Sequence, residues 1–253
     1  MTKTLLITGG SRGIGAATAR LAVAHDFRVA INYLDNATAA DALKRHIETA
    51  GGSAMTIQCD VAKPADVARM FTEVERSLGA VDALVNSAGL SGNERRVAEF
   101  DVTVLERMLA VNITGTILCC REAVRRMSTA SGGQGGVIVN VSSMAATIGG
   151  RASASDYAAS KAAVDAFSRG LAKEVGDEGI RVNVVRPGMT LTDMAHTLRD
   201  DPTLKSTIPM NRIADADEIA RPILWLLGDD ASFISGACVD ASGGGFIVGS
   251  REP

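Results

Sequence analysis

Strand-length apolar runs alternate with helical patterns from one end of the 253-residue chain to the other. Most runs are continuous and rich in Val, Ile and Leu, which is typical of parallel strands covered on both faces. Such alternation favours right-handed crossovers and an α/β fold, a doubly wound parallel sheet of about seven strands with helices on both sides. The expected strands are Thr4–Gly9, Arg28–Tyr33, Ala54–Gln58, Ala83–Asn86, Val137–Val141, Arg181–Arg186 and Ala237–Asp240. The expected helices are 14–24, 37–50, 64–78, 103–127, 155–175 and 215–228.

The composition and the segment pattern exclude several classes of protein. No internal repeat or long linker divides the chain, so residues 1–253 are expected to form a single domain. The net charge of −3 disfavours nucleic-acid binding, which needs a basic stripe. No apolar run approaches the roughly 18 residues that span a membrane, and a strand-like run starts near the first residue, so we expect a cytoplasmic protein. The cysteines lack CxxC spacing and the histidines lack HxxxH spacing, so no metal site is expected.

A glycine-rich turn joins the first expected strand to the first expected helix. The turn, Thr8–Gly15, reads TGGSRGIG. Its glycines let the backbone approach a pyrophosphate closely and let the helix pack tightly on the strand. The helix N-terminus adds unpaired N–H groups and a partial positive charge that suit a phosphate. The turn therefore predicts a dinucleotide site at the carboxyl ends of the strands.

The residues after the second expected strand select between the two nicotinamide dinucleotides. An acid at the tip of that strand would hold the ribose 2′-hydroxyl of NAD and repel a 2′-phosphate. Here the strand ends in Asn32 and Tyr33, and Asp35 falls beyond the expected contact point. Arg12, inside the glycine turn, could pair with a 2′-phosphate. NADP(H) is therefore expected in preference to NAD(H); the alternative is that Arg12 is a solvated surface charge.

Several further motifs occur in the order and structural context of one known family. Together they resemble the short-chain dehydrogenase/reductase family of nicotinamide-dependent Rossmann-fold enzymes, over nearly the whole chain. The motifs are TGxxxGxG at Thr8–Gly15, Asn86-Ser87-Ala88-Gly89 (NNAG with Ser87 for the second Asn), Asn112-Ile113-Thr114-Gly115 (NxxG), Val139–Ser143, Tyr157-Ala158-Ala159-Ser160-Lys161 (YxxxK), Arg186-Pro187-Gly188 and Thr192.

The resemblance implies a role for each matching residue. Its catalytic tetrad falls on Asn112, Ser143, Tyr157 and Lys161, with Ser142 as the alternative serine. Asn112 would anchor a water that links the lysine to solvent. The cofactor contacts expected from the turn and the resemblance are Gly9, Ser11, Arg12, Gly13, Ile14, Gly15, Asn32, Tyr33, Asp60, Val61, Asn86, Ala88, Gly89, Tyr157, Lys161, Pro187, Gly188 and Thr192. The family commonly forms tetramers, so a homotetramer or a dimer is expected.

Tyr157 and Lys161 suit proton transfer during hydride transfer. A carbonyl that receives a hydride becomes an alkoxide and needs a positioned acid. Free tyrosine titrates near 10, but Lys161 lies four residues on, on the same helical face, where its ammonium favours the phenolate. Ser143 would orient the substrate oxygen. These residues predict an oxidoreductase that acts on a carbonyl or a secondary alcohol.

Two polar segments leave the sheet edge where ligands of open α/β sheets bind, at about 91–100 and 189–210. They are the expected substrate loops. The candidate substrates are a 3-oxoacyl thioester, a sugar and a small ketone. Two alternatives remain within and beyond the enzyme class: an NAD-preferring sugar or alcohol dehydrogenase of the same family, and a catalytically idle dinucleotide-binding sensor. A Rossmann-like methyltransferase is disfavoured because it has no use for YxxxK.

Overall fold

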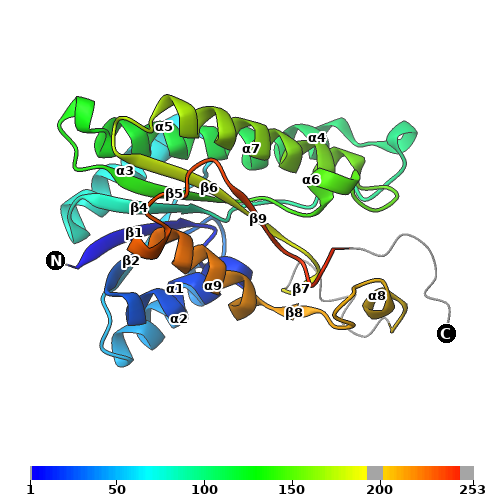
Figure 1. Ribbon diagram of the computed structural model, residues 1–253, viewed down its shortest axis with the longest axis horizontal. Coiled ribbons are helices and arrows are strands. Elements are labelled where there is room, and N and C mark those ends of the chain that lie inside the picture. The colour runs from blue at the N-terminus through cyan, green and yellow to red at the C-terminus, as the bar shows by residue number, and fades with distance from the viewer. Residues whose placement is uncertain (1, 193–201, 246–253) are drawn as a thin grey trace.

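The computed structural model describes residues 2–192 and 202–245 (Figure 1). The strands are β1 (Lys3–Thr8), β2 (Phe27–Tyr33), β3 (Ala54–Gln58), β4 (Val81–Asn86), β5 (Gly136–Val141), β6 (Ile180–Pro187), β7 (Thr190–Leu191), β8 (Ala214–Asp215) and β9 (Cys238–Ala241). The α-helices are α1 (Gly13–Ala22), α2 (Ala37–Thr49), α3 (Pro64–Leu78), α4 (Val102–Leu109), α5 (Thr116–Met127), α6 (Ala145–Ile148), α7 (Ser155–Glu174), α8 (Pro202–Ser206) and α9 (Ala216–Leu227).

Seven of the strands form one parallel sheet, which confirms the predicted fold class. Their order is β3-β2-β1-β4-β5-β6-β9, and every pairing in the sheet is parallel. The chain builds outwards from β1 to β3, then returns to place β4 on the other edge of β1. At such a reversal the connections on either side lead to opposite faces of the sheet, which opens a crevice at the carboxyl ends of the strands.

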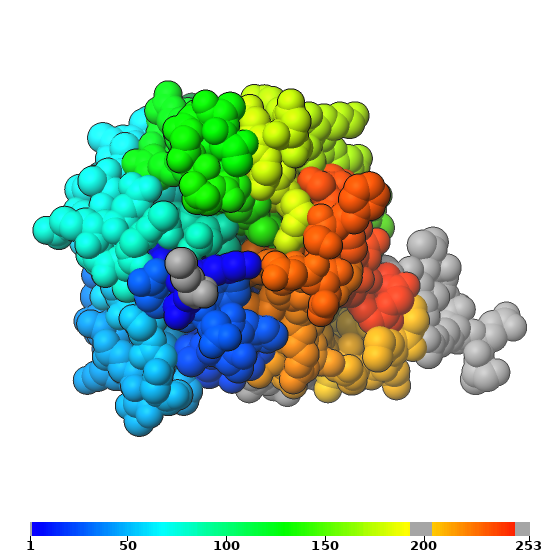
Figure 2. All heavy atoms as spheres, turned by 60° about the vertical axis from the view of Figure 1, so that its left-hand side comes forward, coloured from blue at the N-terminus to red at the C-terminus, as the bar shows by residue number. Residues whose placement is uncertain are grey.

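Helices cover both faces of this sheet. In Figure 1, α3, α4, α5 and α7 lie above the sheet and α1, α2 and α9 lie below it. Alternate residues of β1 enter the two cores: Leu6 packs with α3 and α5, whereas Leu5 and Ile7 pack with α1 and α9. Figure 2 shows the orange surface of α9 beside the blue N-terminal segment, although the two are far apart in sequence. Burial on both faces explains why the strands are apolar without alternation.

Local sequence marks where several helices begin. Asp101 accepts the backbone N–H of Thr103 at 2.8 Å and so caps α4. Pro64 is the first residue of α3, where its missing N–H costs nothing. Asp215 and Glu218 form a reciprocal capping box at the start of α9. These caps satisfy N–H groups that the helices themselves leave without a partner.

The segment expected as one helix over 103–127 contains a π-helical turn. This turn, Ala110–Gly115, separates α4 from α5 and contains Asn112. Thr116 donates its hydroxyl to the Asn112 carbonyl at 2.9 Å, so a side chain satisfies a backbone acceptor beside the widened turn. Periodicity did not reveal the turn, because the same face of the segment stays apolar on both sides of it.

The segment Val102–Met127 is also long and apolar enough, by length and composition, to cross a membrane. The expectation that no segment approaches that length was therefore wrong. In the structure, Cys119, Cys120 and Ala123 of this segment are fully buried in the core against the sheet.

The expected long loop at 189–210 is partly ordered into regular structure. Thr190 and Leu191 pair in parallel with Ala214 and Asp215, so that β7 and β8 form a second, two-stranded sheet. Helix α8 lies within the same loop, and residues 193–201 are outside the described part of the chain. The other expected loop, 91–100, contains a single 3₁₀ turn at Val97–Glu99.

Candidate active site

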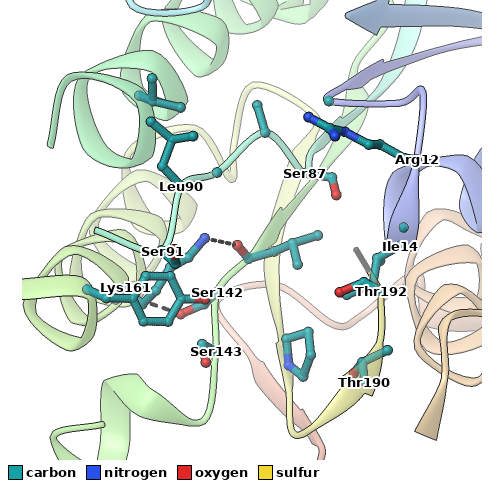
Figure 3. Close-up of a pocket in the computed structure, with 18 of the residues that line it drawn as sticks. Arg12, Ile14, Ser87, Leu90, Ser91, Ser142, Ser143, Lys161, Thr190 and Thr192 are labelled. Carbon is teal, nitrogen blue, oxygen red and sulfur yellow. Dashed lines mark hydrogen bonds between the residues drawn. The ribbon is translucent and has the colours of Figure 1, made fainter. Parts of the chain in front are cut away.

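A cavity of about 580 Å³ runs along the carboxyl ends of the strands. Figure 3 shows Ser142, Ser143 and Lys161 on one side of it and Arg12 and Thr192 on the other. The predicted site residues that line the cavity are Gly9, Ser11, Arg12, Gly13, Ile14, Asn32, Tyr33, Asp60, Val61, Ala88, Gly89, Ser143, Tyr157, Lys161, Pro187, Gly188 and Thr192. Three predicted residues, Gly15, Asn86 and Asn112, do not line it.

The glycine turn has a shape that only glycine allows. Gly9 and Gly13 have φ angles of 61° and 54°. A Cβ on Gly9 would lie 2.7 Å from the Ala88 Cα, and a Cβ on Gly15 would lie 2.5 Å from the Gly9 carbonyl oxygen. The absence of a side chain at Gly15 therefore lets α1 pack closely against the turn.

The N-terminus of α1 opens this turn towards the cavity. Arg12 is the N-cap residue of α1, and its side chain makes no capping hydrogen bond to the helix. The first amides of a helix need an acceptor, and the helix dipole favours an anion there. Ser11, Arg12, Gly13 and Ile14 all line the cavity beside these amides. The turn therefore fits the phosphates of a dinucleotide.

Two predicted contact residues, Asn32 and Asn86, form hydrogen bonds that tie the strands together next to the turn. The Asn32 side chain accepts the Gly9 N–H at 3.1 Å and donates to the carbonyl oxygens of Ile57 and Cys59. Since its polar atoms are already engaged, Asn32 ties β2 and β3 to the turn. Asn86 is buried and donates to Asn140 Oδ1 at 2.9 Å, so it joins β4 to β5. Asn86, predicted as a cofactor contact, thus has its side chain in this interior network and does not line the cavity.

The end of the cavity near β2 carries charges of both signs. Arg12 and Asp35 both line it. Asp35, which the sequence placed beyond the expected contact point, thus borders the cavity. The chain turns back at Leu34–Asn36, just before α2, and this turn brings the carboxylate alongside the cavity.

Asp60 makes a bidentate ion pair that the sequence did not reveal. Its carboxylate oxygens accept from the two terminal nitrogens of Arg107 at 3.0 and 3.1 Å. Burial raises the pKa of Asp60, but the Arg107 hydrogen bond and the Ala62 N–H outweigh burial and hold it below its usual range. Arg107 itself lines the cavity. Nothing in the sequence near Arg107 marks it, because α4 meets β3 only in the folded chain.

The opposite end of the cavity brings together the serine, tyrosine and lysine. Ser143 accepts the Ala145 N–H at 3.1 Å and hydrogen-bonds the Tyr157 side chain. The neighbouring Ser142 is buried and donates to the Lys161 carbonyl oxygen at 3.1 Å. Of the two serines, Ser143 is therefore the one that faces the tyrosine.

Lys161 is buried, and its ammonium is held by a backbone group. Its Nζ donates to the Val141 carbonyl oxygen at 2.9 Å and lies 5.8 Å from the centre of the Tyr157 ring. Burial lowers the pKa of Lys161 to about 8, although nearby Asp165 acts in the opposite direction. Burial also raises the pKa of Tyr157, with the Ser143 hydrogen bond opposing it. The pKa of Tyr157 thus moves opposite to the sequence-based expectation, because burial outweighs the Ser143 hydrogen bond.

Asn112 holds the chain beside the lysine. Its side chain accepts the Leu90 N–H at 2.8 Å and donates to the Leu90 carbonyl at 2.9 Å and to Ser160 Oγ at 3.0 Å. A Cβ on the preceding Gly89 would lie 3.4 Å from Asn112 Oδ1 and 3.5 Å from Lys161 Nζ. Asn112 is fully buried and does not reach the cavity.

A buried aspartate joins the expected substrate loop 91–100 to α7, the helix that carries Tyr157. Asp156 Oδ2 accepts the backbone and side-chain N–H groups of Asn93 at 3.1 and 3.2 Å, and its Oδ1 accepts the Tyr157 N–H at 2.8 Å. Gly92, with a φ of 85°, packs so tightly that a Cβ there would lie 2.7 Å from this carboxylate. The loop therefore approaches α7 directly beside Tyr157. No sequence motif pointed to Asp156.

The end of the cavity near Ser143 has exposed apolar side chains and an ion pair at its edge. Leu90 and Ile148 remain 40% and 50% exposed, although both line the cavity. Glu94 from the first substrate loop and Arg151 from the loop after α6 form an ion pair of 3.7 Å across it. A ligand in this half of the cavity would cover the exposed apolar side chains.

The cysteines and the described acidic and histidine residues form no metal centre. In residues 2–192 and 202–245, no three His, Cys, Asp or Glu side chains are grouped to hold a metal ion. Burial raises the pKa of Cys59 and of Cys120 to about 12, so both remain thiols at neutral pH.

A doubly wound sheet with a glycine turn at its first crossover, and a Ser-Tyr-Lys group across the same cavity, defines a dinucleotide-binding oxidoreductase. A family model described as enoyl-(acyl carrier protein) reductase matches residues 9–245. The chain is 45% identical over 243 residues to the uncharacterized oxidoreductase YgfF of Escherichia coli (strain K12), covering 94% of this chain and 98% of that protein. It is 39% identical over 246 residues to 3-oxoacyl-[acyl-carrier-protein] reductase of Bos taurus, covering 96% and 98%.

Solved structures of nicotinamide-cofactor complexes have the same fold as this chain. A short-chain dehydrogenase from Burkholderia cenocepacia J2315 in complex with NADP superposes with a TM-score of 0.90 at 35% identity, covering 97% of this chain and 98% of that one. A blue fluorescent protein from a metagenomic library, in complex with NADPH, has a TM-score of 0.87 at 34% identity, covering 96% and 97%. The chain belongs to the short-chain dehydrogenase/reductase family and is an NAD(P)-dependent oxidoreductase.

Proposed function

We propose that this protein transfers a hydride between NADP(H) and a carbonyl or secondary alcohol substrate, with Tyr157 as the acid/base. The observation that carries the proposal is the single cavity that has the glycine turn at one end and Ser143, Tyr157 and Lys161 at the other. A catalytically idle sensor would have no need for a tyrosine and a lysine aligned on this cavity. The chain is proposed to be one dinucleotide-binding domain over 1–253, with substrate loops at 91–100 and 189–210.

Each residue has a separate task in this proposal. The nicotinamide cofactor supplies or accepts the hydride when bound. The Ser143 hydroxyl donates to the substrate oxygen and orients it beside Tyr157. Tyr157 Oη gives its proton to that oxygen, and the Lys161 ammonium stabilises the phenolate that remains. Asn112 positions the Leu90 segment against Lys161 and is proposed to hold the water that connects the lysine to solvent.

The pKa directions favour reduction of a carbonyl. Because burial raises the pKa of Tyr157, the hydroxyl is protonated at neutral pH and can act as an acid. Lys161, with a pKa of about 8, carries its charge below that pH and loses it as the pH rises through that value. The two groups are therefore both in the state that reduction requires at neutral and mildly acidic pH.

The cofactor is proposed to be NADP(H) in preference to NAD(H). Arg12 lines the cavity at the end near β2, where a guanidinium would pair with a 2′-phosphate. The Burkholderia dehydrogenase and the metagenomic protein were each solved with a 2′-phosphorylated cofactor. The specific observation that favours the alternative, NAD(H), is the carboxylate of Asp35 in the same part of the cavity.

The substrate is proposed to be a small carbonyl compound, with a 3-oxoacyl thioester, a sugar and a small ketone as candidates. Relatives include 3-oxoacyl-[acyl-carrier-protein] reductase and carbonyl reductase family member 4 of Xenopus laevis. The exposed Leu90 and Ile148 favour an apolar group next to the reacting carbon. Among these candidates, a thioester or an apolar ketone therefore fits better than a sugar.

The protein is proposed to be a cytoplasmic homotetramer, or a dimer, that binds neither nucleic acid nor membrane. Val102, Val104 and Ile117 leave apolar side chains exposed on α4 and α5, and Trp225 and Phe233 do so near the C-terminal strand. Contacts between subunits would cover such surfaces.

The test is the oxidation of NADPH with a panel of ketones, 3-oxoacyl thioesters, enoyl thioesters and sugars, with NADH in parallel. Replacing Tyr157 by Phe is expected to lower kcat by about 10²–10⁴-fold, since general acid catalysis is lost while the ring remains. Binding of NADPH, measured by fluorescence, is expected to be retained. Ser143→Ala should lower kcat, whereas Ser142→Ala, which removes only a hydrogen bond to the Lys161 backbone, should cost much less. Substantial turnover by Tyr157→Phe would refute the mechanism.

A further inference from the structure

A buried carboxylate lies one helical turn beyond the catalytic lysine. Asp165 is four residues after Lys161 on α7 and is 5% exposed. Its Oδ2 accepts from Arg186 Nε at 2.7 Å. Its Oδ1 is buried and has no hydrogen-bond partner. Buried carboxylate oxygens are normally hydrogen-bonded, so the unpaired oxygen of Asp165 lowers the stability of the fold. A functional role for the carboxylate would explain why it is there.

Arg186 connects this carboxylate to the surface. The arginine is itself 9% exposed, and its Nη1 donates to Asp240 Oδ1 at 3.1 Å. The Asp240 side chain is 46% exposed. Asp165, Arg186 and Asp240, from α7, β6 and β9, therefore form a chain of paired charges that begins one helical turn after Lys161 and ends at the surface.

In the described part of the chain, the groups in contact with the Lys161 ammonium are uncharged. On its own helix its ammonium lies over the Tyr157 ring, and the charge of Asp165, one turn further on, acts on its pKa. From β5 it receives the Val141 carbonyl, and the segment after β4 approaches it with the backbone of Gly89. A buried ammonium without a counter-charge gives up its proton readily, because the low dielectric disfavours the charged form.

We propose that Asp165, held in place by Arg186, is a positioning residue that keeps the buried Lys161 ammonium charged. It acts through Lys161 and contacts neither substrate nor cofactor. This inference rests on the proposed function, in which the charged lysine stabilises the Tyr157 phenolate. Its physical basis is the location of a buried negative charge on the face of α7 that carries the lysine.

The direction of the lysine pKa is consistent with this role. Burial lowers the pKa of Lys161 from its ordinary value to about 8, and Asp165 opposes that change. Without the aspartate the pKa would fall further, and the ammonium would be lost at a lower pH. The positive charge of Arg186 partly offsets the effect of the Asp165 carboxylate on the lysine. Removing the arginine should therefore raise the pKa of Lys161.

The experiment measures the titration of Lys161 directly. The protein is labelled with ¹³C at lysine Cε, and the Lys161 signal is assigned by its absence in Lys161→Arg. In Asp165→Asn, the midpoint is expected to fall by about 1 pH unit or more, as for the loss of a close opposite charge. In Arg186→Gln, the midpoint is expected to rise. Asp165→Glu should restore much of the shift, and Asp240→Asn, at the exposed end, should change the midpoint little.

The pH profile of NADPH oxidation is measured on the same variants. Its alkaline limb should move to lower pH in Asp165→Asn and to higher pH in Arg186→Gln. Opposite shifts separate an electrostatic role from general loosening, which would move both variants alike. If the Lys161 midpoint is unchanged in both variants, the proposal is wrong even if the enzyme is active. If no substrate oxidises NADPH but the midpoints shift as expected, the charge pairing stands and the proposed function fails.

Discussion

The glycine turn packs closely against the loop after β4. Adding a single methyl group to a glycine of the turn tests whether this packing is needed for stability and cofactor binding. Gly9 and Gly132 both have positive φ, at 61° and 87°. A Cβ on Gly9 would lie 2.7 Å from the Ala88 Cα and 2.8 Å from the Ala88 N, whereas a Cβ on Gly132 would meet nothing within 4 Å. Gly9→Ala and Gly132→Ala therefore share the backbone strain and differ in the steric clash.

The expected magnitudes follow from these contacts. The left-handed conformation costs a non-glycine residue about 1–2 kcal/mol, which both variants suffer. The clash at Gly9 is with backbone atoms that cannot rotate away, and overpacking of this kind adds about 1–3 kcal/mol. Gly9→Ala should therefore lose about 2–5 kcal/mol of unfolding free energy, and Gly132→Ala about 1–2 kcal/mol.

The assay is equilibrium unfolding in urea, together with NADPH binding by fluorescence. Gly9→Ala should also weaken NADPH binding, because the turn must move away from Ala88 and its amides move with it. Gly132→Ala should bind NADPH normally, since it lies far along the chain in the turn before β5. Equal losses of stability in the two variants, or normal NADPH binding by Gly9→Ala, would refute the packing argument.

Two further substitutions test the two ends of the cavity. Arg12→Ala should weaken NADPH binding by about 10–100-fold, the worth of a charge-assisted contact, and leave NADH binding almost unchanged; a wild-type preference for NADH would overturn this assignment. Asp156→Ala frees the Asn93 loop from α7 and should raise KM for the carbonyl substrate by about tenfold or more at unchanged NADPH affinity. Asp156→Asn, which keeps an acceptor for the Asn93 N–H, should recover part of that loss, and an unchanged KM in Asp156→Ala would show that the loop is not part of the substrate site.

Local patterns in the sequence predicted the fold because each element carries its own signal. The continuous apolar runs of the strands reflect burial on both faces, and the order of elements leaves few ways to arrange a parallel sheet. The glycine turn could be predicted for the same reason. Its tight geometry depends on the absence of side chains at Gly9 and Gly13, and that absence is visible in the sequence.

Other features could not be predicted, because they depend on contacts between distant segments. The pairing of Asp60 with Arg107 joins the end of β3 to α4. The hydrogen bond from Asn93 to Asp156 joins the segment 91–100 to α7. The inward orientation of Asn86 likewise depends on the neighbouring strand, since its partner is Asn140. No residue near any of these positions in sequence indicates its partner.

The sequence by itself determined the class of protein, an NAD(P)-dependent oxidoreductase, since it places Tyr157 and Lys161 one turn apart on a helix and a glycine-rich turn at the first crossover. The tertiary structure decided the electrostatics of that pair. Burial raises the pKa of Tyr157 and lowers that of Lys161, and the carboxylate of Asp165 on α7 is paired with Arg186 from β6. The physical reason is that spacing along a helix is a local property, whereas desolvation and charge pairing depend on every segment that packs around the site.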